Sequence, residues 1–80
     1  MNPETIDLAI LATCAGEKSV SPAEVAEGLM PGGHWQALLP KVKERAIALM
    51  LEGRIEILRK GKPVTDPVEV RGVVRLRAKA

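Results

Sequence analysis

The spacing of apolar residues in this 80-residue chain changes once, at Gly53. Before Gly53, apolar residues recur every three or four positions, which is the spacing of an amphipathic helix. After it, apolar and charged residues alternate in residues 54–59 and again in residues 73–77, as in strands with one buried face. The sequence therefore predicts a helical part followed by two strands that pair as an antiparallel hairpin.

Two helices are expected in the first 30 residues. The first runs from Pro3 to Cys14, with Asn2 as its N-cap, Pro3 at the first helical position and Gly16 ending it. The second runs from Pro22 to Leu29, because Ser-Pro-Ala-Glu at its start is a capping box and the Pro-Gly-Gly after it cannot continue a helix.

A third helical region precedes Gly53. Because Pro40 interrupts it, we expect a short turn at His34–Leu38 and then a main helix from Leu39 to Glu52. Trp35 is the chain's only aromatic residue, and we expect it to anchor the junction between the second and third helices.

Two turns are expected between the strands. Lys60-Gly61-Lys62-Pro63 bends the chain first, and Thr65-Asp66-Pro67 marks a second turn in which Asp66 is a local cap. Val74 and Leu76 then point inward. With a short extended piece at residues 18–20, the order is helix, strand, helix, helix, strand, wing, strand. It predicts one α+β winged helix-turn-helix domain over residues 1–80, with a disordered tail at 78–80.

Several segments resemble a small bacterial winged-helix family known only as a conserved domain of unknown function. They are SPAEVA, Trp35 followed by leucines and Pro40, GRIEILRKGKPVTDP and GVVRLR, and the match covers about residues 18 to 78. The resemblance implies the fold and no particular reaction or ligand. The residues that the resemblance assigns to the family pattern are Trp35, Gly61, Pro63, Asp66, Pro67, Gly72, Arg75 and Arg77.

Charge is divided unequally along the chain. Residues 1–53 carry four basic and seven acidic residues, net −3, whereas residues 54–80 carry eight basic and three acidic residues, net +5, giving +2 in total. This asymmetry indicates an anionic partner, and in a winged helix the third helix and the wing can both contact DNA. The residues expected to bind nucleic acid are Lys41, Lys43, Arg45, Arg59, Lys60, Lys62, Arg75 and Arg77. Contact with four to six phosphates would give a log–log salt slope of about −4 to −5.

Recognition of a specific base sequence is not expected. Glu44 and Glu52 on the third helix repel phosphate, and the helix offers no Asn for reading bases. The hypothesis is therefore a regulatory protein that binds double-stranded DNA weakly or without sequence preference.

Two alternatives remain open. The domain could be a protein-interaction module that docks through Leu8, Leu11, Ile47 and Leu51, which lie off the main apolar stripes. The basic hairpin could instead only solubilise the chain and block edge pairing. Residues of the family pattern could likewise serve the geometry of the wing rather than binding: Arg75, for instance, could pair with Glu56 across the strands.

Other chemistry is not expected. Cys14 lies on the apolar stripe of the first helix and is expected in the core, and His34 is expected at the surface, so we expect no metal, cofactor or enzymatic activity. The N-terminus lacks a basic signal-peptide region, and no apolar run is long enough to span a bilayer. We therefore expect a bacterial cytoplasmic protein without membrane contact.

Overall fold

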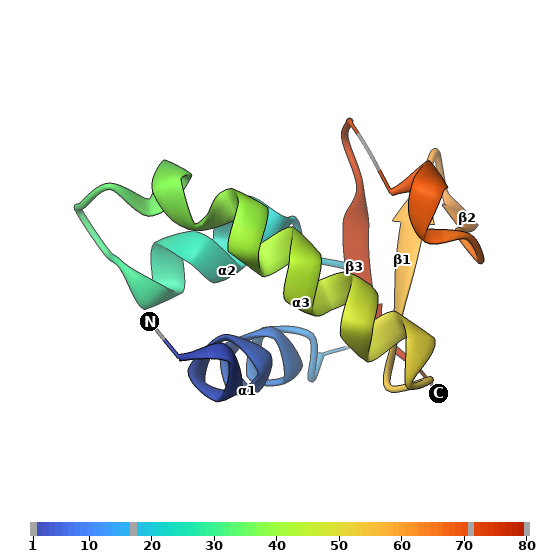
Figure 1. The fold of residues 1–80 in the computed structure, drawn as a ribbon, viewed down its shortest axis with the longest axis horizontal. Helices are drawn as coiled ribbons and strands as arrows, with labels where there is room; N and C mark the ends of the chain where they lie inside the picture. Colours follow the sequence, from blue (N-terminus) through green and yellow to red (C-terminus); the bar gives the residue numbers. More distant parts are fainter. Residues whose placement is uncertain (1, 17, 71, 80) are drawn as a thin grey trace.

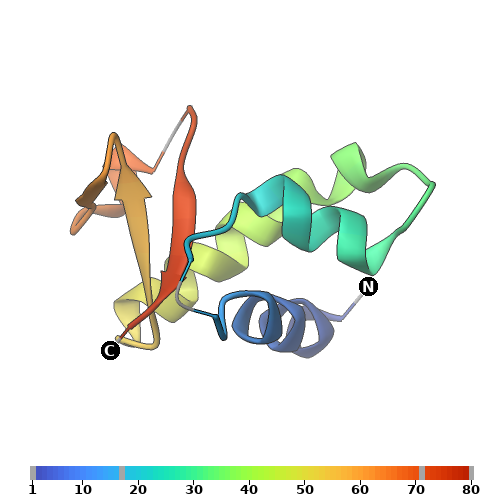
Figure 2. The same cartoon turned by 180° about the vertical axis from the view of Figure 1, so that it is seen from behind.

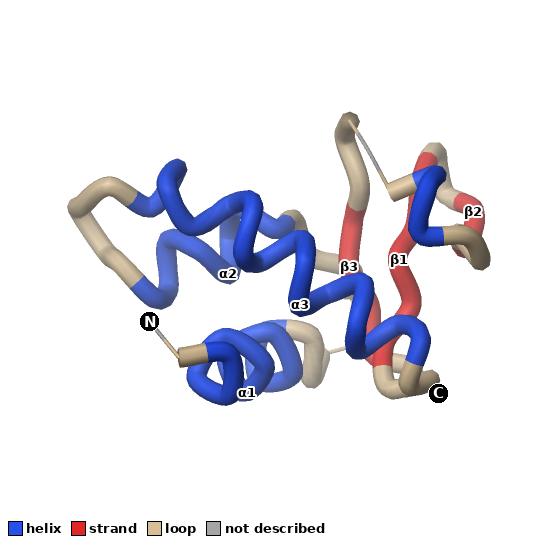
Figure 3. Tube along the Cα trace, viewed as in Figure 1, coloured by secondary structure: helices blue, strands red, loops and turns tan. Residues whose placement is uncertain are grey.

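The computed structural model describes residues 2–16, 18–70 and 72–79. Three α-helices and two short 3-10 helices combine with a three-stranded antiparallel sheet in the C-terminal part of the chain (Figure 1). The fold is α+β, as predicted, and its arrangement is compatible with a winged helix. In Figures 2 and 3 the helices lie together beside one face of the sheet, and the N- and C-terminal ends of the chain lie apart.

The first two helices begin where their capping residues predict. Helix α1 spans Pro3–Thr13, one residue shorter than expected, and the Asn2 side chain accepts a hydrogen bond from the Glu4 backbone N–H at 2.7 Å. Helix α2 spans Pro22–Leu29, and both hydrogen bonds of its predicted capping box are present at 3.2 Å. These bonds satisfy backbone donors that a helix start otherwise leaves without partners.

The third helical region is divided as Pro40 predicts. A 3-10 helix, η1, spans Trp35–Leu38, and helix α3 follows directly at Leu39–Leu51. Gly53 has a φ of 76°, and it ends the helix together with the bond from the Arg54 backbone N–H to the Leu49 carbonyl. This is the geometry of a Schellman motif, in which glycine avoids the strain of a left-handed residue.

The sheet has the order β2-β1-β3 and includes a short strand, β2, that was not predicted. The extended piece predicted at residues 18–20 joins the sheet through the isolated bridge between Val20 and Leu76. Strand β1 spans Ile55–Arg59 and β3 spans Arg75–Ala78. The bend predicted at residues 60–63 is tighter than expected, because Lys62–Pro63 forms the short strand β2. Ala78, which we expected in a disordered tail, pairs with Ile55 instead, and residue 80 of that tail lies outside the described residues.

The core lies between the three helices and the inner face of the sheet. Cys14, within one turn of the end of α1, is fully buried as predicted, and burial raises the pKa of its thiol. Predicted inward positions Val74 and Leu76 are also buried. The main cluster of buried core residues consists of Ile6, Ile10, Cys14, Val25, Ala26, Val42, Ala46, Leu49, Ile55, Ile57, Val74 and Leu76. Among the described residues, no helix has the length and apolar character needed to cross a membrane.

Candidate nucleic-acid interface

The wing begins with a two-residue turn between β1 and β2. Arg59 pairs with Lys62, and the two residues between them, Lys60 and Gly61, have φ angles of 54° and 82°. Left-handed φ at both central residues is what a type I′ hairpin turn requires. Lys60 is the single non-glycine residue with positive φ in the described part of the chain, and lysine is not a residue that this position favours.

Three basic side chains converge around one hollow beside this turn. We call it the wing hollow; it has a volume of about 370 Å³ and is lined by Arg59, Lys60, Lys62, Pro63, Val64 and Glu69. Lys60 and Lys62 are exposed, and Arg59 is partly buried. Within residues 2–16, 18–70 and 72–79, none of the three cations has a hydrogen-bond or ion-pair partner for its side chain. Their charges are therefore available to an anion from solvent.

Glu69 was not predicted as part of this site. It belongs to a second 3-10 helix, η2, at Pro67–Glu69, whose N-cap Asp66 accepts a hydrogen bond from the Val68 backbone N–H at 3.0 Å. The predicted Asp66 cap is thus confirmed. The predicted cap was the one sequence feature that could have placed Glu69 at this site, because a single helical turn after Asp66 returns the chain toward the strands. The carboxylate of Glu69 offsets part of the positive charge at the wing hollow.

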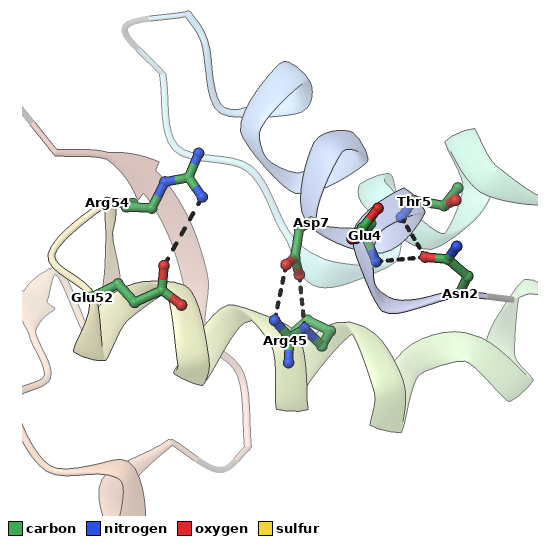
Figure 4. A network of polar contacts seen from close by, with 7 residues as sticks. All are labelled: Asn2, Glu4, Thr5, Asp7, Arg45, Glu52 and Arg54. Carbon is green, nitrogen blue, oxygen red and sulfur yellow. Dashed lines mark hydrogen bonds and ion pairs between the residues drawn. The ribbon is translucent and has the colours of Figure 1, made fainter.

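Arg45, predicted as a DNA contact, is bonded inside the domain. Its guanidinium donates two hydrogen bonds to the Asp7 carboxylate on α1, at 2.8 and 2.9 Å (Figure 4). The hydrogen bond from Arg45 holds the pKa of Asp7 below its ordinary value. This bidentate pair joins α1 to α3, and such pairs fix both distance and orientation.

Arg77 and Arg75 also have partners within the domain. Arg77 faces Glu56 across β1 and β3 and donates a hydrogen bond to its carboxylate at 3.0 Å. The predicted pairing of Arg75 with Glu56 is therefore wrong, because the true partner lies two residues further along the strand. Arg75 instead donates to the side-chain oxygen and the backbone carbonyl of Ser19, at 2.8 and 2.6 Å. Next to it, Leu76 and Val20 form an isolated β-bridge. Arg75 therefore ties the last strand to the segment before α2.

Helix α3 offers few free charges. The Lys43 ammonium donates to the Gly72 carbonyl at 3.4 Å, whereas Lys41 is exposed and has no such partner among the described residues. Glu44 and Leu51 are exposed on the same helix. Of the eight predicted contact residues, the structure brings Arg59, Lys60 and Lys62 together at the wing hollow, and it bonds Lys43, Arg45, Arg75 and Arg77 within the domain.

The whole domain matches a known family. The model of a family described as "Protein of unknown function (DUF3253)" covers residues 3–79 of the chain. The chain belongs to this family. The resemblance stated from SPAEVA and RKGKPV is thus confirmed, although DUF3253 carries no activity that could be transferred to the site. No curated protein matches the chain. What a DUF3253 domain does has therefore to be argued from the geometry of the site.

Proposed function

We propose that this DUF3253 domain binds the phosphate backbone of nucleic acid through its wing, without reading base sequence. The observation that carries the proposal is the convergence of Arg59, Lys60 and Lys62 on one hollow, with no partner for their charges in the described structure. Basic side chains that contact phosphate position a protein on a duplex but carry no sequence information. The proposal therefore narrows the predicted site from helix and hairpin together to the wing.

The conformation of Lys60 supports this assignment. A lysine with a φ of 54° costs more free energy than the asparagine or glycine usually found at this position. Unfavourable backbone conformations are concentrated at functional sites. A need for a positive charge at the tip of the turn, where it can contact phosphate, explains why lysine occupies this position.

The outer surface of α3 supports the absence of sequence reading. A recognition helix contacts base edges through polar side chains that can donate and accept hydrogen bonds in the major groove. Here exposed Glu44 would repel phosphate, exposed Leu51 has no polar group, and Arg45 is held by Asp7. Lys41 is the remaining exposed cation of α3.

The test is a titration with a short random-sequence duplex at 50 and 200 mM salt. Three phosphate contacts predict a log–log salt slope of about −2.7 and a loss of affinity of about 40-fold between the two salt concentrations. Lys60→Gln with Lys62→Gln should reduce the slope by about 1.8. The control, Lys18→Gln with Lys79→Gln, changes the net charge equally at two residues that do not line the wing hollow, and it should retain the slope. No binding at 50 mM salt, or equal effects of both pairs, would refute the proposal.

A protein-interaction role is the second candidate. Leu8 and Leu51 are 68% and 64% exposed, so both side chains are accessible to an apolar partner. Leu11 and Ile47, the other two predicted docking residues, are partly buried and pack against the core. Apolar docking through the two exposed leucines would be insensitive to salt. A domain that only docks proteins should not bind the duplex at 50 mM salt, so the same titration distinguishes the two functions.

A further inference from the structure

A second hollow lies at the other end of the molecule. We call it the Trp35 hollow; it has a volume of about 660 Å³ and is lined by Glu24, Glu27, Gly28, Pro31, Gly32 and Trp35. The molecule is 31 Å long, and the loop between α2 and η1 lies at one end of this axis while β2 lies at the other (Figures 1 and 2). The Trp35 hollow is thus separate from the wing hollow.

Gly28 lines this hollow without contributing a side chain to it. It lies within α2, and a Cβ added to it would meet no heavy atom within 4 Å. Its φ is not in the left-handed region, so the backbone does not require glycine there. Glycine inside a helix is less favourable than alanine. Glycine at this position therefore weakens α2 without a packing reason, and it leaves open space in the wall of the hollow.

The side chains around the hollow suit a planar cation. Trp35 lines the hollow while it is partly buried and packed against the core, as predicted for an anchor of this junction. Tryptophan is the aromatic residue that attracts cations best, and an arginine guanidinium both stacks on aromatic faces and bonds to carboxylates. Glu24 and Glu27 are exposed carboxylates beside it, and among the residues that the structure describes no basic side chain lines the hollow.

We propose that the Trp35 hollow binds an arginine side chain on an exposed segment of another protein. The guanidinium stacks against the indole, and the Glu27 carboxylate pairs with its positive charge. Complementary charge favours this occupant, because the two ionisable residues in the described lining of the hollow, Glu24 and Glu27, are both acidic. The hollow is larger than one side chain, so residues flanking the arginine fit as well. This binding is independent of the phosphate contact proposed for the wing.

Trp35 itself reports occupancy, because it is the only aromatic residue of the chain. The full chain is titrated with a five-residue peptide that has a central arginine between glycines, and with the same peptide carrying citrulline. Citrulline has the shape of arginine without its charge. We expect a saturable change in Trp35 emission, with a Kd roughly 10-fold lower for the arginine peptide. Equal responses to both peptides would overturn the proposal.

Substitutions at Gly28 separate binding from folding. Gly28→Leu places a side chain in the open space and should abolish the arginine response. Gly28→Ala, the matched control, should retain most of the response and raise the Tm, because alanine favours the helix. Undiminished binding by a folded Gly28→Leu variant would refute the assignment, with folding checked by far-UV circular dichroism.

The carboxylates are tested without disturbing the helix start. Glu24→Gln with Glu27→Gln removes both charges, while glutamine at position 24 can still complete the capping box. The double variant should bind the arginine peptide several-fold more weakly and bind duplex DNA no less tightly than the unmodified chain. Trp35 emission that depends on protein concentration without peptide would indicate that a second copy of the chain occupies the hollow, and it would overturn the assignment to another protein.

Discussion

The two ends of the molecule differ in the sign of the charge that they offer. The wing hollow collects Arg59, Lys60 and Lys62, whereas the Trp35 hollow is bordered by Glu24 and Glu27. Each end also contains a residue that its backbone conformation does not favour: a lysine in a left-handed turn at one end and a glycine within a helix at the other. A net charge of +2 hides this division, so the placement of the charges is more informative than their sum.

In the part of the molecule between these ends, three arginine side chains are hydrogen-bonded to other residues of the domain. Arg45 is bonded to Asp7, Arg77 to Glu56, and Arg75 to Ser19. These three arginines hold helices and strands together, although in the sequence they look the same as the arginine of the wing. Whether a basic residue has a partner within the domain is therefore the distinction to test.

Reversing the charge of the wing should give the largest effect. Lys60→Glu with Lys62→Glu removes two phosphate contacts and adds repulsion, so duplex affinity at 50 mM salt should fall on the order of 100-fold or more. Fluorescence anisotropy of a labelled duplex measures the loss. The response of Trp35 to the arginine peptide should stay the same. A parallel loss of both activities would mean that the two ends do not act separately.

The Asp7–Arg45 pair should matter for stability rather than binding. Asp7→Asn breaks the charge-assisted contact between α1 and α3, and it should lower the free energy of unfolding by about 1 kcal/mol, as measured by urea denaturation. Glu44→Gln, which removes an exposed charge on α3, should leave stability nearly unchanged. Similar stabilities for the two variants would show that the pair contributes little.

The same pair predicts how stability depends on pH. Because the folded state lowers the pKa of Asp7, the stabilisation is fully present above the ordinary value of 3.8 and is lost as pH falls through the lower folded-state pKa. Urea titrations between about pH 5 and pH 2 should therefore show a decrease that is smaller in Asp7→Asn. Identical pH profiles for both proteins would contradict this expectation.

Relieving the strained turn should separate stability from binding. Lys60→Asn places a residue that tolerates positive φ at the tip of the hairpin, so it should raise the free energy of unfolding by about 0.5 kcal/mol and the Tm by about 2–4 °C. Duplex affinity should fall, because one phosphate contact is lost. Lys60→Gln, which removes the charge without suiting the turn, should weaken binding without the gain in Tm.

Glu69 should give the smallest effect. Glu69→Gln removes the carboxylate that lines the wing hollow and should strengthen duplex binding by about 2-fold at low salt, since exposed charges interact weakly. Glu27→Gln makes the same change in charge at the opposite end, and it should leave duplex affinity closer to that of the unmodified chain. Equal gains would indicate a general effect of net charge.

The sequence predicted the elements better than the contacts between them. Capping residues and Pro40 located the helices to within a residue at most ends, because those signals act over one turn. Alternation gave the inward faces of Val74 and Leu76, but it could not distinguish Arg75 from Arg77 opposite Glu56. A shift of two residues along a strand keeps every side chain on its face, so the pattern leaves that choice open.

The candidate site was predicted only in part for a related reason. The density of charge at residues 59–62 pointed to the wing without any knowledge of the fold. The partner of Arg45 lies 38 residues away on another helix, and that contact depends on how α1 and α3 are rotated against each other. The Trp35 hollow was missed because it is assembled from a helix face and the loop that follows it, each of which has an ordinary explanation when read alone.

The bridge between Val20 and Leu76 has a consequence for how the chain folds during synthesis. Each residue donates its backbone N–H to the carbonyl of the other, at 2.8 and 2.6 Å, and the Leu76 side chain is completely buried. The helical part therefore cannot complete its core until residues 75–78 have left the ribosome. Contacts between residues so distant in sequence slow folding, because a long loop has to close before they form. A nascent chain halted before β3 should be more sensitive to proteases than the complete chain.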